Sequence, residues 1–150
     1  MAKVLVTDAL ASQGVELLEQ TRGIEVVNKP GTSPEELLEL IGDADGLIIR
    51  SATKVTAEVL AKAEKLKVVG RAGIGVDNVD VSAATQHGVV VVNTPEGNNI
   101  TTAEHAIALM VSLARHIPQA TASMKASKWE KKKFQGMELY NRVLGVVGAG

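Results

Sequence analysis

The sequence predicts an α/β fold in which helices pack against a parallel β-sheet. Through the first 95 residues, short apolar segments alternate with polar, helix-forming segments. The apolar segments are continuous aliphatic runs, whereas a strand with one face in water alternates apolar and polar residues. This rhythm favours a parallel sheet that is covered on both faces and joined by right-handed crossovers.

Each predicted strand is short, rich in β-branched residues and bounded by turn-forming residues. The first strand, KVLVTD, begins almost at the initiating methionine, with no apolar stretch typical of a signal peptide. The five predicted strands are residues 3–8, 23–29, 46–51, 66–73 and 89–95.

The segments between the strands carry helix-start signals. The most complete one combines Ser33 as N-cap, Pro34 at the first helical position and Glu36 three residues after the cap. Ser12 and Thr56 are expected to cap the neighbouring helices in the same way. A glycine, Gly88, closes the fourth helix. The predicted helices are residues 12–21, 33–43, 56–64 and 80–87.

After residue 95 the rhythm changes. A long helix is expected to begin at Thr101 or Thr102, with Glu104 completing a capping box, and Pro118 interrupts it. Residues 119–142 are polar and lysine-rich and suggest an arm, and VLGVVGAG then starts a new strand and turn. The sequence therefore predicts a boundary that separates residues 1–97 from residues 98–150. The apolar positions expected to form a buried face of the long helix are Ala103, Ala106, Ile107, Met110, Leu113, Ala114 and Ile117.

Composition excludes several classes of protein. The chain has 150 residues and a net charge of −1, which argues against a general nucleic-acid binder. It has no cysteine, so disulfides and thiolate metal sites are excluded, and its three histidines lack metal-ligand spacing. No apolar run approaches the roughly 20 residues of a membrane span. We therefore expect a soluble, cytoplasmic protein that binds neither metal, membrane nor nucleic acid.

Two arginines mark a candidate anion site. Arg50 and Arg71 each stand at the carboxyl end of a predicted strand, where parallel sheets bind ligands. Guanidinium groups suit the bidentate capture of carboxylate or phosphate. The segment RAGIGVDN, residues 71–78, adds a Gly-x-Gly loop whose amides could face an anion. The alternative is two surface arginines at loop edges.

Two further patterns are weak by themselves. The final GVVGAG follows an apolar strand as a dinucleotide-binding fingerprint does, but the helix and the third glycine are absent. The lysines at 125, 128 and 131–133 suggest either a nucleic-acid patch or a solvated arm, and the near-zero net charge favours the arm.

The segment IIRSATKVTAEVLAKAEKLKVVGRAGIGVDNVDVSAATQHGVVVVNTPEGN, together with RHIPQATASMKASKWEKKKFQG, resembles the D-2-hydroxyacid dehydrogenases. The resemblance covers essentially the whole chain. It implies a flavodoxin-like substrate domain at residues 1–97, followed by the truncated start of a Rossmann domain for NAD at residues 98–150. Within the family, the lysine-rich arm with Trp129 favours oxidation of 3-phosphoglycerate in serine biosynthesis.

The resemblance assigns roles to individual residues. Ile74, Gly148 and Gly150 correspond to NAD-binding positions. The family's catalytic arginine, glutamate and histidine correspond to nothing in this chain, so no turnover is expected from it alone. Substrate-binding positions are Arg50, Ser51, Lys54, Arg71, Ala72, Gly73, Asn98 and Lys131. Lys131 replaces an arginine of some family members, which weakens the case for a bidentate phosphate contact there.

Other functions stay open at this point. Within the same fold, the substrate could be glyoxylate or hydroxypyruvate instead. The chain could also be a folding or ligand-binding fragment without catalysis. A response-regulator module is excluded, because it would need an aspartate at the end of the third strand, where this sequence has Arg50. Self-association through residues 100–142 is expected, because the long helix and all three aromatic residues lie there.

Overall fold

The computed structural model describes residues 1–148. The chain divides into two compact units, Met1–Asn98 and Asn99–Gly150. In the described residues, no helix is long and apolar enough to cross a membrane.

The first unit is built on a five-stranded sheet whose paired strands are all parallel. The order β2-β1-β3-β4-β5 places β1 between β2 and β3, so the chain changes direction across the sheet at β1. The carboxyl ends of β1 and β3 therefore flank the switch point, where open α/β sheets bind ligands. The strands are β1 Ala2–Val6, β2 Ile24–Asn28, β3 Gly46–Ile49, β4 Val68–Arg71 and β5 Val90–Asn93.

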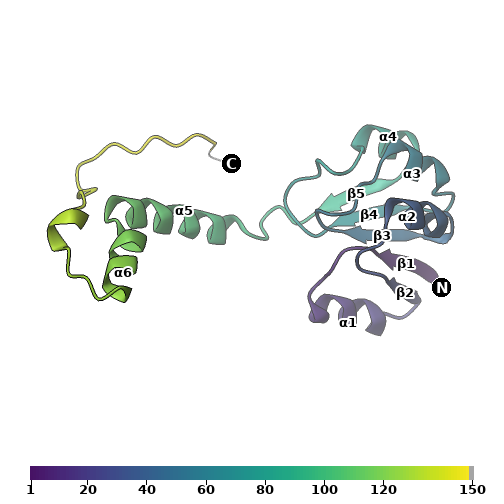
Figure 1. Cartoon of the computed structure of the whole chain (residues 1–150). Helices are drawn as coiled ribbons and strands as arrows, with labels where there is room; N and C mark the ends of the chain where they lie inside the picture. Colours follow the sequence, from purple (N-terminus) through teal and green to yellow (C-terminus); the bar gives the residue numbers. More distant parts are fainter. Residues whose placement is uncertain (149–150) are drawn as a thin grey trace. The chain divides into compact units, whose positions relative to one another are not determined.

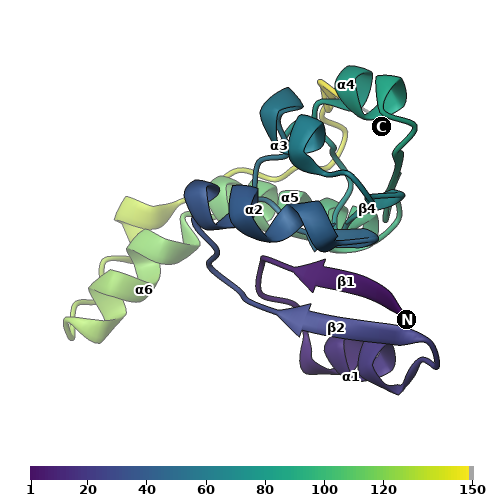
Figure 2. The same cartoon turned by 90° about the vertical axis from the view of Figure 1, so that its right-hand side faces the viewer.

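Helices α2, α3 and α4 lie on one face of the sheet, and α1 lies on the other, beside β2 (Figure 1 and Figure 2). The core forms on the three-helix side. A short 3₁₀ turn, η1 Ile41–Asp43, follows α2. The helices are α1 Ser12–Gln20, α2 Pro34–Leu40, α3 Ala57–Lys62 and α4 Val81–Gln86. The large side chains that are almost fully buried include Leu5, Ile41, Leu47, Ile49, Leu60, Val55 and Val69.

Local capping explains where most of these helices start. The Ser33 hydroxyl accepts from the Glu36 amide at 3.1 Å, and the Thr56 hydroxyl accepts from Val59 at 3.4 Å. The prediction for Ser12 was wrong, because Ser12 is the first helical residue. The extended backbone of a cap belongs to Ala11, which has no side-chain oxygen to offer.

The α1 side of the sheet is covered only in part by the described residues. Register places Val68, Val90 and Val92 on one face with Gly46 and Ile48. The three valines are 37%, 59% and 48% exposed. The prediction of helices on both faces is therefore met at the β1–β2 side but not at β4 and β5.

The second unit has two helices and a 3₁₀ turn: α5 Asn99–Ala114, α6 Ile117–Lys125 and η2 Lys131–Phe134. The long helix begins at Asn99, earlier than the predicted Thr101 or Thr102. It is interrupted as predicted, but the break is at His116, which takes a left-handed conformation with φ 52°. Pro118 then lies in the first turn of α6, where a missing amide costs nothing. Residues 117–125, predicted as the end of the long helix and the start of the arm, form this second helix.

Two packing predictions for this unit were wrong. None of the residues of α5 is buried, and Ile107, Leu109 and Leu113 are 57%, 58% and 74% exposed. Residues 143–147 form no strand, although the sequence pattern suggested one. A strand requires a neighbour for its backbone hydrogen bonds, and the described part of the chain supplies none at this position.

Candidate functional site

The candidate site lies at the switch point of the sheet. Ile49 of β3 stands in register with Arg71 of β4, so Arg50 and Arg71 leave two neighbouring strands at the same edge. A hydrogen bond also joins the two strand ends: the Ala72 amide donates to the Ile49 carbonyl at 2.8 Å. The structure thus brings together the two strand ends that the sequence selected.

The two guanidinium groups are held differently. Arg50 is exposed, and its Nη1 donates to the Ala9 carbonyl in the loop after β1 at 3.2 Å. Arg71 folds over Gly73, where a methyl group would overlap its guanidinium. The Arg71 Nε is buried and has no hydrogen-bond partner among the described residues. Burying such a donor without a partner is unfavourable, so Arg71 has capacity for an acceptor.

Two of the amides in the glycine loop after β4 are already bonded within the protein and are not available to the anion that was predicted there. The Ala72 amide already donates to Ile49, and the Gly73 amide donates to the Arg71 carbonyl at 2.9 Å. The Gly73 carbonyl accepts from Thr94, and the Ile74 carbonyl accepts from the Asn93 side chain at 2.6 Å. In this structure the Arg71 side chain, not these two amides, supplies the free donor.

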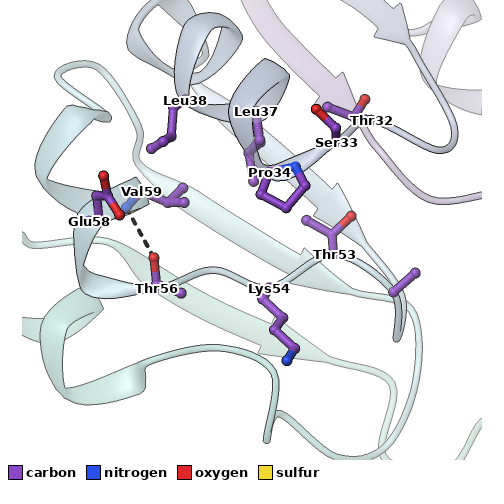
Figure 3. A pocket seen from close by; sticks show the side chains of 11 residues that line it. Thr32, Ser33, Pro34, Leu37, Leu38, Thr53, Lys54, Thr56, Glu58 and Val59 are labelled. Atoms are coloured by element: carbon purple, nitrogen blue, oxygen red, sulfur yellow. Dashed lines mark hydrogen bonds between the residues drawn. The ribbon is translucent and has the colours of Figure 1, made fainter.

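A cavity of about 370 Å³ lies beside the loop after β3. Its walls include Pro34 and Leu37 from α2, Thr53 from the loop after β3 and Val59 from α3 (Figure 3). Lys54 lines it as well, and its side chain extends away from Pro34 in the view shown. Neither arginine lines this cavity, so it is a neighbour of the arginine pair and not the space between the two side chains.

A buried polar cluster beneath the arginines was not predicted. Asp8 is only 6% exposed, and its carboxylate accepts from the amides of Arg50, Ala52 and Thr53 and from the Thr53 hydroxyl. Burial alone would raise the pKa of Asp8, but these four donors together lower it below its ordinary value of 3.8. The carboxylate is therefore ionised at neutral pH. The only sequence signal for it was an aspartate at the end of the first strand.

Asn78 closes the same loop from the opposite side. Its Nδ2 donates to the carbonyls of Arg50, at 2.8 Å, and Thr53, at 2.6 Å. Nothing in the sequence singled out this residue, because an asparagine in a loop is common and its two partners lie 25 and 28 positions away.

The remaining predicted site residues belong to the loop after β3, to the end of the first unit or to the second unit. Ser51 is exposed on the loop after β3, and Asn98 is exposed at the end of the first unit. Lys131 is exposed in η2 of the second unit, and Gly148 lies in the extended segment at the end of that unit, with φ 84°. Gly150 lies outside the described residues.

The family model for the catalytic domain of the D-isomer specific 2-hydroxyacid dehydrogenases matches residues 4–145. The chain belongs to this family.

Similar proteins agree with this membership. A D-3-phosphoglycerate dehydrogenase from Methanocaldococcus jannaschii is 54% identical over 150 residues, which is all of this chain and 28% of the relative. The chain spans 27–28% of the length of the first curated dehydrogenases it matches.

Solved structures of the family share this architecture. The TT0316 protein from Thermus thermophilus matches with a TM-score of 0.81 and 33% identity, over 91% of this chain and 45% of that one. An NAD⁺-bound 3-phosphoglycerate dehydrogenase from Entamoeba histolytica matches with a TM-score of 0.67 and 38% identity, over 76% of this chain and 39% of that one. The expected resemblance to a dehydrogenase of this family, and the α/β fold, are confirmed.

Proposed function

We propose that residues 1–97 form the substrate-binding part of a cytoplasmic, NAD-dependent 3-phosphoglycerate dehydrogenase that serves serine biosynthesis. The observation that carries this proposal is the buried Nε of Arg71, which has no hydrogen-bond partner among the described residues and lies at the carboxyl end of β4, one strand away from Arg50. The high identity to a protein named D-3-phosphoglycerate dehydrogenase supports the choice of substrate.

The chemistry of the two arginines suits a doubly anionic acid. 3-Phosphoglycerate carries a carboxylate and a phosphate, and each guanidinium can bind one such group through paired N–H donors. Arg71 would have to turn its guanidinium away from Gly73 to present its N–H groups to an anion. Arg50 would exchange the Ala9 carbonyl for an anion, which makes a stronger hydrogen bond. Ser51 and Lys54, both exposed on the adjoining loop, can add a hydroxyl and a second positive charge.

The described residues do not by themselves form a site for NAD. A dinucleotide site needs a strand, a glycine turn and the N-terminus of a following helix. Gly148 has the positive φ that such a turn uses, but residues 143–147 are not a strand. Ile74 is 41% exposed and remains a proposed nicotinamide contact. We therefore expect no NADH formation by these 150 residues alone.

Calorimetric titration with 3-phosphoglycerate tests the proposal. Hydrogen bonds to charged groups contribute about 1.5–3 kcal/mol each, so Arg50→Ala should weaken binding roughly 10- to 150-fold. Arg22→Ala is the matched control, because Arg22 is an exposed arginine just before β2, at the opposite edge of the sheet. Equal affinity of Arg50→Ala and wild type would remove the site. Equal binding of glyoxylate or hydroxypyruvate would favour a different 2-hydroxy acid.

We also propose that residues 100–142 associate with a second copy of the chain. The exposed aliphatic residues of α5 lie on more than one side of that helix, and Trp129 and Tyr140 are 79% and 80% exposed. Large apolar surfaces of this kind favour association. Light scattering at micromolar concentration should show a dimer or larger species, which Trp129→Ala shifts toward monomer. A strictly monomeric wild type would refute this.

A further inference from the structure

The loop after β3 is fixed by side chains from two other parts of the first unit. From the segment after β1, the Asp8 Oδ2 accepts from the Arg50 amide at 2.6 Å and from the Ala52 amide at 3.2 Å. The Asp8 Oδ1 accepts from the Thr53 hydroxyl at 2.8 Å, and that hydroxyl also contacts the Thr7 hydroxyl at 2.8 Å. Thr7, Asp8 and Thr53 are all buried, so these bonds are shielded from water.

The opposite side of the loop is held from the segment after β4. The Asn78 side chain donates to the carbonyls of Arg50 and Thr53, and its backbone carbonyl accepts from the Val55 amide at 2.9 Å. Arg50 therefore has its amide bound to Asp8 and its carbonyl bound to Asn78. Both polar groups of its backbone are held by side chains from other elements.

These hydrogen bonds fix the backbone position from which the Arg50 side chain extends. Arginine has a long, flexible side chain, and a binding group works only when its supporting atoms hold it to within about 0.5 Å. Without the hydrogen bonds from Asp8 and Asn78, the loop after β3 would be free to move. Substrate binding would then have to order this loop, which costs free energy.

We propose that Asp8 and Asn78 are positioning residues that hold the Arg50 backbone for capture of the substrate anion. This inference rests on the proposed function of Arg50. Neither side chain touches the substrate in this scheme. Both act through Arg50, and the effect of removing them should disappear when the Arg50 side chain is absent.

The fold supplies a matched control for Asp8. Asp45 also accepts a backbone amide from β1, that of Lys3 at 2.9 Å, and in addition pairs with Lys67 at 2.9 Å. It precedes β3, whereas Arg50 follows that strand, so Asp45 lies at the opposite edge of the sheet. Asp45→Asn therefore disturbs the same two strands without touching the loop that carries Arg50.

Titration calorimetry with 3-phosphoglycerate on the whole 150-residue chain tests the proposal. Asp8→Asn places an N–H group against the donors that now face a carboxylate, and should weaken binding roughly tenfold, equivalent to about 1.4 kcal/mol. In an Arg50→Ala background the same change should have no further effect, and Asp45→Asn should bind as wild type does. Unchanged affinity of a folded Asp8→Asn, or an equal loss with and without Arg50, would overturn the inference.

Two further measurements keep the test decisive. If Asp8→Asn does not fold by circular dichroism, Asn78→Ala takes its place, since Asn78 is only partly buried and the same coupling to Arg50 is expected. If wild type binds no 3-phosphoglycerate, the proposed function fails. Amide hydrogen exchange then tests separately whether Asp8 and Asn78 hold the Arg50 backbone. Faster exchange at Arg50 in the variant supports positioning, and unchanged exchange refutes it.

Discussion

Replacing Gly73 by alanine should weaken anion binding while leaving the first unit folded. A Cβ at Gly73 would lie 2.7 Å from the Arg71 Cζ and 3.3 Å from its Nε, inside the 3.4 Å at which ordinary contact begins. The group that must move is the end of a flexible side chain, so the backbone need not shift. Arg71 would leave its position, and the loss of one hydrogen bond to a charged group costs about 1.5–3 kcal/mol. The expected loss of affinity is therefore about 10- to 150-fold.

Calorimetric titration with 3-phosphoglycerate measures this loss, and thermal unfolding by circular dichroism checks the fold. Gly70→Ala is the control, because a Cβ on this residue of β4 would meet its nearest neighbours, Ile48 of β3 and Val92 of β5, at an ordinary 3.8 Å. Gly70→Ala should bind 3-phosphoglycerate with wild-type affinity and unfold at the same temperature as wild type. Wild-type affinity in a folded Gly73→Ala would show that the Arg71 side chain does not bind the anion in the position seen here, and the reasoning would fail.

Two further predictions concern stability. Leu47 lies in the central strand and has no exposed surface, so Leu47→Ala should lower the free energy of unfolding by about 2–5 kcal/mol in urea titrations. Val92 lies on the partly exposed face of the sheet, so Val92→Ala should change the free energy of unfolding by less than about 0.5 kcal/mol. Equal effects would place the core elsewhere. Because the pKa of Asp8 is lowered on folding, its contribution to stability is complete above its ordinary pKa and is lost as the pH falls through the lower folded value. The stability difference between wild type and Asp8→Asn should therefore shrink as the pH falls from above the ordinary pKa of 3.8 through the lower folded pKa, and a difference that grows on acidification would contradict the sign of this shift.

The local signals in the sequence predicted the first unit well because each one has a short-range cause. Ser33, Pro34 and Glu36 fix a helix start through contacts within four residues, and the structure places the start there. The aliphatic runs predicted all five strands, since such continuous runs are typical of the strands of parallel sheets. Ser12 failed because a neighbouring residue took the cap conformation, which is a matter of backbone geometry.

The second unit shows the limits of the same signals. Helical spacing of apolar residues in α5 predicted a buried face, but burial also requires a partner surface, and no residue of α5 is buried in the described part of the chain. The aliphatic run at 143–147 likewise has strand propensity without a strand beside it. Propensity is a property of the segment, whereas pairing and burial are properties of its neighbours.

The sequence by itself determined the family, the α/β class and the two arginines at strand ends, because motif spacing and strand boundaries are written along the chain. Tertiary structure alone decided that Asp8 and Asn78 meet at the backbone of Arg50. These contacts join residues 28 to 42 positions apart. No local pattern encodes them, since the order β2-β1-β3-β4-β5 brings the three loops together only when the sheet is assembled.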